Sequence, residues 1–123
     1  MSYPKPASAP DGRPLGLATT HVICRRDDVP IGQMRSFAVG SADILLIRTS
    51  DERFYAIGNE CSHAEAQLDM GELLLSRCEI ECPLHGGRFD FTTGEATQEP
   101  CEDPLEAFPV TVDDDDVRVD LGG

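Results

Sequence analysis

Two short motifs that combine cysteine with histidine constrain this chain more than any other feature. Residues 61–63 read Cys-Ser-His, and residues 82–89 read Cys-Pro-Leu-His-Gly-Gly-Arg-Phe. Thiolates and imidazoles bind soft or borderline metals, and a spacing of two or three residues lets one loop present both side chains. The two motifs therefore predict a metal site built from two loops, with four candidate ligands: Cys61, His63, Cys82 and His85.

The residue types alone leave three interpretations of this site open. The four side chains could be ordinary buried residues that happen to fall at metal-binding spacing. A structural Cys₂His₂ zinc site has the right ligand types, but zinc fingers place both cysteines before both histidines and need a helix, which this sequence does not predict. The third interpretation is a [2Fe–2S] cluster with two histidines on one iron.

The paired motif Cys-x-His and Cys-Pro-Leu-His-Gly-x-x-Phe resembles the Rieske iron–sulfur family. The similarity extends from about residue 17 to residue 121, and it is greatest to the small ferredoxin components of bacterial Rieske non-haem, aromatic-ring-hydroxylating oxygenase systems. The resemblance implies one [2Fe–2S] cluster per chain. Cys61 and Cys82 would bind the inner iron, and His63 and His85 would bind the outer iron. Such a site is formally neutral when oxidised, so it accepts an electron more readily than a Cys₄ cluster.

The resemblance also predicts a low reduction potential. Rieske proteins similar to those of respiratory chains carry an extra cysteine in each loop, where this chain has Leu84 and a cysteine-free stretch at 64–68. They also carry a hydroxyl residue and a tyrosine at the positions of Gly87 and Phe89. Because O–H donors stabilise the extra negative charge of the reduced cluster, we expect a potential of roughly −150 mV, at the low end of the Rieske range.

The rest of the sequence predicts an all-β fold: a small Rieske-like β-sandwich or barrel base with an inserted cluster-binding lobe. The chain of 123 residues has room for one domain. Residues 1–16 are rich in proline and predict a flexible lead-in, followed by a single domain at 17–121. Its base would comprise 17–58 and 105–121, and its lobe 59–104. Short β-rich runs separated by turn residues predict strands at 17–25, 34–39, 44–48, 53–57, 110–112 and 117–121, with apolar and polar residues alternating in the first and the last two, and no long helix.

Acidic residues dominate the charge of the chain. Ten basic residues against 23 acidic ones give a formal net charge of −13, which argues against nucleic acid or an anionic membrane as a partner. The segment 60–106 alone holds 12 acidic residues and two arginines. We expect this segment to form an acidic face for transient docking to a basic partner. Charge that serves only solubility is the open alternative.

The sequence predicts a cytoplasmic protein. It contains neither a run of 18 apolar residues nor a signal-peptide core. Its five cysteines are an odd number, which in a reducing compartment favours metal binding over a disulfide framework. Cys24 and Cys78 are expected to be small core residues, and Cys101 is expected to lie near the cluster. The run 113–116 predicts an acidic hairpin tip.

By resemblance, the chain carries single electrons from a flavin-containing NAD(P)H ferredoxin reductase to a terminal oxygenase of aromatic hydrocarbon catabolism. It is predicted to be a monomer, with no small-molecule substrate, and not an enzyme. Only His21 remains for an oxygen-activating iron site, and the sequence has no Gly-rich dinucleotide fingerprint. The alternatives are a tightly bound Rieske subunit of a larger oxidoreductase and a structural zinc module.

Overall fold

The computed structural model describes residues 20–40, 42–61, 66–84, 86–99, 101 and 103–121, so the predicted lead-in at 1–16 lies outside the described residues. These residues form short strands and three one-turn 3₁₀ helices, which confirms the all-β prediction. In chain order the elements are β1 (Thr20–Arg25), η1 (Arg26–Asp28), β2 (Met34–Val39), β3 (Ala42–Arg48), β4 (Phe54–Gly58), η2 (Leu68–Met70), β5 (Glu72–Leu74), η3 (Leu75–Arg77), β6 (Glu79–Glu81), β7 (Arg88–Asp90), β8 (Ala96–Gln98), β9 (Ala107–Phe108), β10 (Val110–Asp113) and β11 (Asp116–Asp120).

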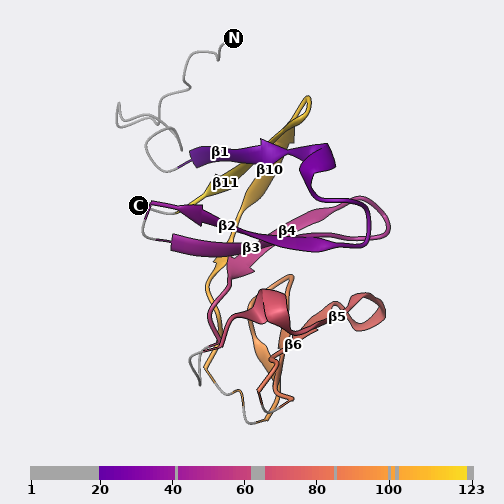
Figure 1. Ribbon diagram of the computed structural model, residues 1–123, viewed down its shortest axis with the longest axis vertical. Coiled ribbons are helices and arrows are strands. Elements are labelled where there is room, and N and C mark those ends of the chain that lie inside the picture. The colour runs from indigo at the N-terminus through magenta and orange to yellow at the C-terminus, as the bar shows by residue number, and fades with distance from the viewer. Residues whose placement is uncertain are drawn as a thin grey trace.

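The strands form three antiparallel sheets that are arranged along the long axis of the molecule (Figure 1). The outer sheet has the order β1-β11-β10, the central sheet β2-β3-β4-β9, and the lobe sheet β5-β6-β7-β8. All four strands of the lobe sheet lie between β4 and β9 in the sequence. The chain therefore leaves the central sheet to build a separate lobe and returns to pair β9 with β4.

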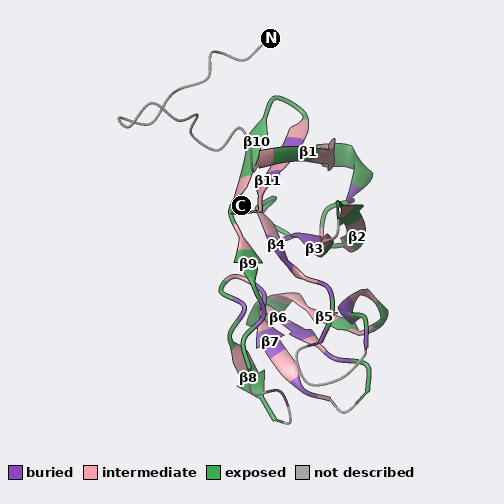
Figure 2. Cartoon of the chain, turned by 90° about the vertical axis from the view of Figure 1, so that its left-hand side faces the viewer, coloured by how far each residue is buried: buried purple, intermediate pink, exposed green. Residues whose placement is uncertain are grey.

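The central sheet is buried on both faces because β3 is apolar at nearly every position. Successive side chains of a strand point to opposite faces. Leu45 and Ile47 accordingly join a core shared with the lobe sheet, whereas Ile44 and Leu46 join a core shared with the outer sheet. β4 divides in the same way, with Ile57 toward the lobe and Ala56 toward the outer sheet. Figure 2 shows the buried segments concentrated in the centre of the molecule and in the lobe.

The lobe sheet is the part of the fold that sequence periodicity missed. Its strands are three residues long, too short for alternation to stand out. The signal is nevertheless present, since Ile80 and Phe89 are each buried between two partly exposed polar residues and pair across β6 and β7. This cross-strand pair places the centre of the lobe sheet in the lobe core.

Two cysteines outside the motifs occupy different environments. Cys24 lies in β1 and is half-buried against the core of the outer sheet. Cys78 is exposed, so the expectation of a core position is wrong for this residue. It ends η3 in the left-handed conformation with φ 57°, and that turn carries its side chain to the surface.

The predicted acidic hairpin is confirmed, because Asp113 pairs with Asp116 where β10 ends and β11 begins.

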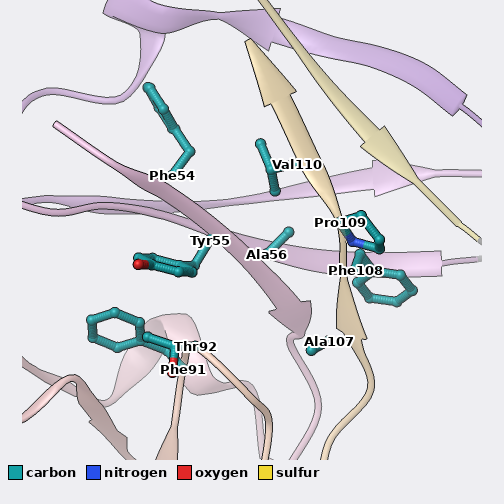
Figure 3. Close-up of a pocket in the computed structure, with 9 residues that line it drawn as sticks. All are labelled: Phe54, Tyr55, Ala56, Phe91, Thr92, Ala107, Phe108, Pro109 and Val110. Atoms are coloured by element: carbon teal, nitrogen blue, oxygen red, sulfur yellow. The ribbon is translucent and has the colours of Figure 1, made fainter.

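A groove of about 380 Å³ runs along the seam between the central sheet and the lobe (Figure 3). Its walls come from residues 54–56, 91–92 and 107–110. The rings of Tyr55 and Phe91 lie next to each other, with centroids 5.6 Å apart and planes tilted by 47°. Neither Cys61 nor Cys82 lines this groove, so it is separate from the predicted metal site.

Among the described residues, no helix has the length or the apolar character needed to cross a membrane.

The burial of the central sheet on both faces can be tested by the same isoleucine-to-alanine change at a buried and at an exposed position. Ile57→Ala removes a fully buried side chain and should lower the free energy of unfolding by about 2–5 kcal/mol, because it leaves a cavity beside the lobe. Ile31→Ala, at a side chain that is 51% exposed, should change it by about 0.5 kcal/mol or less. Urea denaturation followed by circular dichroism measures both values, and equal losses would contradict this packing.

Candidate metal centre

The first motif begins shortly after β4, with Asn59 and Glu60 between them. Glu60 and Gln67 form an isolated antiparallel bridge, and the Cys61 amide donates a hydrogen bond of 2.8 Å to the carbonyl oxygen of Ala66. These contacts close the loop 62–65 at its base. The Cys61 side chain is only 4% exposed and belongs to the lobe core. The backbone pairing therefore holds the thiol inside the protein at the point where the loop begins.

The second motif connects β6 to β7. Glu81 pairs with Arg88 across this hairpin, and their side chains form an ion pair with an Nε–Oε1 distance of 3.0 Å. One residue further in, the Cys82 amide donates a hydrogen bond of 2.7 Å to the carbonyl oxygen of Gly87. Cys82 is 1% exposed, whereas the neighbouring Leu84 is 55% exposed. The loop thus begins at a buried thiol and continues to the surface.

The two loops share one construction. In each, the amide of a cysteine bonds to the carbonyl five residues later and encloses four residues, 62–65 in the first loop and 83–86 in the second. His63 and His85 are within these enclosed segments, but both lie outside the described residues. The structure therefore brings Cys61 and Cys82 into one core, and the ligation by all four side chains stays a prediction.

A buried amide side chain anchors the first loop. Asn59 is fully enclosed, and its Nδ2 donates to Asp43 Oδ2 at 3.1 Å and to Asp69 Oδ1 at 3.2 Å. Its Oδ1 accepts the backbone N–H of Asp69 at 2.9 Å, and its main chain bonds to Asp43 and Leu68. Asn59 thus ties the end of β4 to β3 and to η2, two residues before the first candidate ligand.

Gly71 brings the two loops together. A Cβ atom at this position would overlap the carbonyl oxygen of Glu81 and would lie 3.2 Å from Pro83 Cδ. Only glycine permits the segment that follows η2 to approach the start of the second loop so closely. Since η2 is held by Asn59, the same contacts position both loops relative to each other.

A third cysteine lies at this site. The Sγ atoms of Cys101 and Cys61 are 3.8 Å apart, and the Cys101 side chain is 3% exposed. Burial, followed by the hydrogen bond with Cys61 and the charges of Cys61 and Cys82, raises the pKa of the Cys101 thiol to about 12. Cys101 also packs against Gly87, where a Cβ atom would collide with its sulfur. The expectation that Cys101 lies near the cluster site agrees with this placement.

The residues present fit an iron–sulfur cluster at its cysteine end. Two buried thiols from separate loops meet in one core, and the glycine backbone at 86–87 carries no side chain that would obstruct the approach of an inorganic sulfur. No group of three Cys, His, Asp or Glu side chains arranged to hold a metal ion occurs within the described ranges. His63 and His85 lie outside those ranges.

Comparison with known proteins establishes the family of the chain. The model of the Rieske [2Fe-2S] domain matches residues 19–109, which is most of the sequence. The chain belongs to this family, whose members carry a single [2Fe–2S] cluster.

Its relatives include ferredoxin components of dioxygenase systems. The chain is 40% identical to the ferredoxin component of the p-cumate 2,3-dioxygenase system of Pseudomonas putida, over 81% of this chain and 84% of that protein. It superimposes on the ferredoxin of carbazole 1,9a-dioxygenase from Nocardioides aromaticivorans IC177 with a TM-score of 0.79 and 42% identity, covering 83% and 97% of the two chains. A ferredoxin solved in complex with the oxygenase of carbazole 1,9a-dioxygenase matches with a TM-score of 0.75 and 36% identity, over 83% and 93%.

These relatives confirm the prediction of a Rieske-type ferredoxin that is an electron-transfer component and not an enzyme. Sequence reasoning did not single out Asn59 or Gly71. The signal for Asn59 is its place between an apolar strand and the first motif, where a polar residue must find buried partners. The contacts of Gly71 with Glu81 and Pro83 join two separate segments of the lobe, so no strand or helix periodicity marks this glycine.

The anchoring role of Asn59 leads to a stability prediction. Asn59→Ala removes two hydrogen bonds to carboxylates and leaves the Asp69 amide without its acceptor, so we expect the free energy of unfolding to fall by about 2–4 kcal/mol. Gln67→Ala is the matched control, because among the described residues this exposed side-chain amide donates one hydrogen bond, of 3.3 Å to Asp43, and should contribute about 0.5 kcal/mol or less. Thermal unfolding of both variants measures the difference, and indistinguishable stabilities would show that Asn59 is not an anchor.

Proposed function

We propose that this chain is a one-electron carrier whose single [2Fe–2S] cluster is bound by Cys61 and Cys82 on one iron and by His63 and His85 on the other. The observation that carries the proposal is the pair of cysteine loops, each closed by the amide of a buried cysteine and each containing one histidine. When bound, the cluster supplies a site that gains and loses one electron without a bond to carbon or oxygen.

The chain's own residues determine where the electron enters and leaves. Cys61 and Cys82 are buried in the lobe core, so water and partner proteins do not reach the cysteine end of the site. Pro83 and Leu84, which precede His85, are exposed. We propose that this exposed side of the second loop meets the partner, since electron transfer needs the cluster near a surface and a shuttle needs a small contact that separates quickly.

The proposed partners are a flavin-containing NAD(P)H ferredoxin reductase, which donates the electron, and a terminal ring-hydroxylating oxygenase, which accepts it. The similarity to a ferredoxin solved together with its oxygenase supports the second of these. A low potential is proposed because Phe89 is fully buried without a hydroxyl group and position 87 is a glycine. We also propose that the protein works as a cytoplasmic monomer.

The acidic segment 60–106 is proposed to steer this docking. Within its described part, Glu79 and Glu81 form ion pairs with the two arginines of the segment. The acidic residues Glu60, Glu72 and Glu99 are exposed. Carboxylates that face water on one lobe create a negative field that accelerates encounter with a basic surface at low salt.

Histidine ligation can be tested with a matched pair of substitutions. His85→Cys should retain some cluster, lower its reduction potential and change the EPR spectrum of the reduced protein, because a thiolate adds negative charge to the iron. His21→Cys places the same side chain at an exposed position of β1 and should leave the reduction potential and the spectrum unchanged. Direct voltammetry and EPR measure both quantities.

An unchanged spectrum in His85→Cys would remove this residue from the ligand set. Metal analysis of the wild-type protein accompanies the experiment and should give two irons and two acid-labile sulfides per chain. Zinc without sulfide would contradict the proposed function and support a structural metal module.

The docking face can be separated from the overall charge by two double variants. The first double variant combines Glu60→Lys with Glu99→Lys, next to the site. The second combines Asp27→Lys in η1 with Asp114→Lys in the β10–β11 turn. Each double variant makes the net charge less negative by four. At low salt the first pair should slow electron transfer to the oxygenase about tenfold and flatten its salt dependence. The second pair should have a much smaller effect. Stopped-flow reduction rates that fall equally in both would assign the charge to solubility.

A further inference from the structure

The third cysteine at the site has no place among the four proposed ligands. Cys101 Sγ lies 3.8 Å from Cys61 Sγ in a core from which water is excluded, and geometry alone allows either sulfur to donate the hydrogen bond. We propose that Cys101 donates an S–H···S hydrogen bond to the Cys61 sulfur and thereby raises the reduction potential of the cluster. This inference rests on the proposed function, because it requires Cys61 to be a cluster ligand.

Ligation fixes the direction of this hydrogen bond. A cysteine that binds iron does so as a thiolate and carries no proton. Cys61 can then only accept, and the proton between the two sulfurs belongs to Cys101. A thiol is a weak donor to a neutral acceptor, but a charged acceptor in a water-free core strengthens the bond.

The packing around Cys101 encloses its thiol between both loops. On one side lies the Cys61 sulfur, and on the other lies Gly87, where any Cβ atom would collide with Cys101 Sγ. The carbonyl oxygen of Gly87 in turn accepts a hydrogen bond from the Cys82 amide. Cys101 therefore occupies the space that a side chain at position 87 would need, and a hydroxyl donor cannot be introduced there without displacing it.

The hydrogen bond acts on the reduction step by electrostatics alone. One electron enters the cluster, no bond is broken, and the proton stays on the Cys101 sulfur. Because the added negative charge is shared by the cluster and its sulfur ligands, a donor to Cys61 stabilises the reduced form more than the oxidised form. A residue at position 101 without a donor should therefore make the cluster harder to reduce.

Two variants of nearly equal size separate hydrogen bonding from packing. Cys101→Ala removes the donor, and Cys101→Ser keeps one. At a fixed solution potential, Cys101→Ala should lower the ratio of reduced to oxidised protein about threefold to tenfold, where tenfold corresponds to about 59 mV for one electron. The ratio of reduced to oxidised protein in Cys101→Ser should equal or exceed that of the wild type. Cys24→Ala, in the outer sheet, is the matched control and should match the wild type.

A second measurement does not depend on either variant holding its cluster. Wild-type protein reconstituted in D₂O should show shifted Fe–S stretching bands in its resonance Raman spectrum, because the S–H of Cys101 becomes S–D. The inference is overturned if Cys101→Ala and Cys101→Ser shift the potential equally or not at all. It is also overturned if neither variant binds a cluster and the wild-type bands are insensitive to D₂O. Wild-type protein without iron and sulfide would instead overturn the proposed function itself.

Discussion

Two backbone hydrogen bonds determine the geometry of the proposed cluster site. The amides of Cys61 and Cys82 each bond to the carbonyl five residues further along, and each bond fixes where a loop leaves the core. Because the donor is the amide of the cysteine itself, each bond holds a buried thiol in the lobe core at the residue where its loop begins.

These loops are held in register by the central sheet. β3 is buried on both faces, so it supplies a wall to the lobe core and another to the core of the outer sheet. Asn59 links the first loop to β3 through its hydrogen bond with Asp43, and Gly71 lets the segment after η2 pack closely against the start of the second loop. The site therefore depends on a sheet whose role is purely structural, and on two residues that no ligand motif contains.

Much of this could be predicted from the sequence. The strands of the outer sheet, and β2, β3 and β4 of the central sheet, follow from alternating or continuous apolar runs. Where both ends are described, they agree with the predictions to within one or two residues. The two-residue strand β9 of the central sheet was not predicted. The lobe sheet was not predicted, because three-residue strands such as β6 carry too little periodicity. The contacts of Asn59, Gly71 and Cys101 join separate segments of the chain, and only the folded structure brings those partners together. The prediction of a core position for Cys78 was wrong, because this residue adopts a left-handed backbone conformation, which is rare for cysteine, and its side chain is exposed.

The most direct measurement of the central claim is pulsed EPR of the dithionite-reduced protein carrying ¹⁵N-labelled histidine. The claim is that two imidazoles and two thiolates bind opposite ends of one diiron cluster. The account predicts a paramagnetic [2Fe–2S] signal with couplings to two histidine nitrogens. A reduced cluster whose spectrum shows no histidine nitrogen coupling would contradict it.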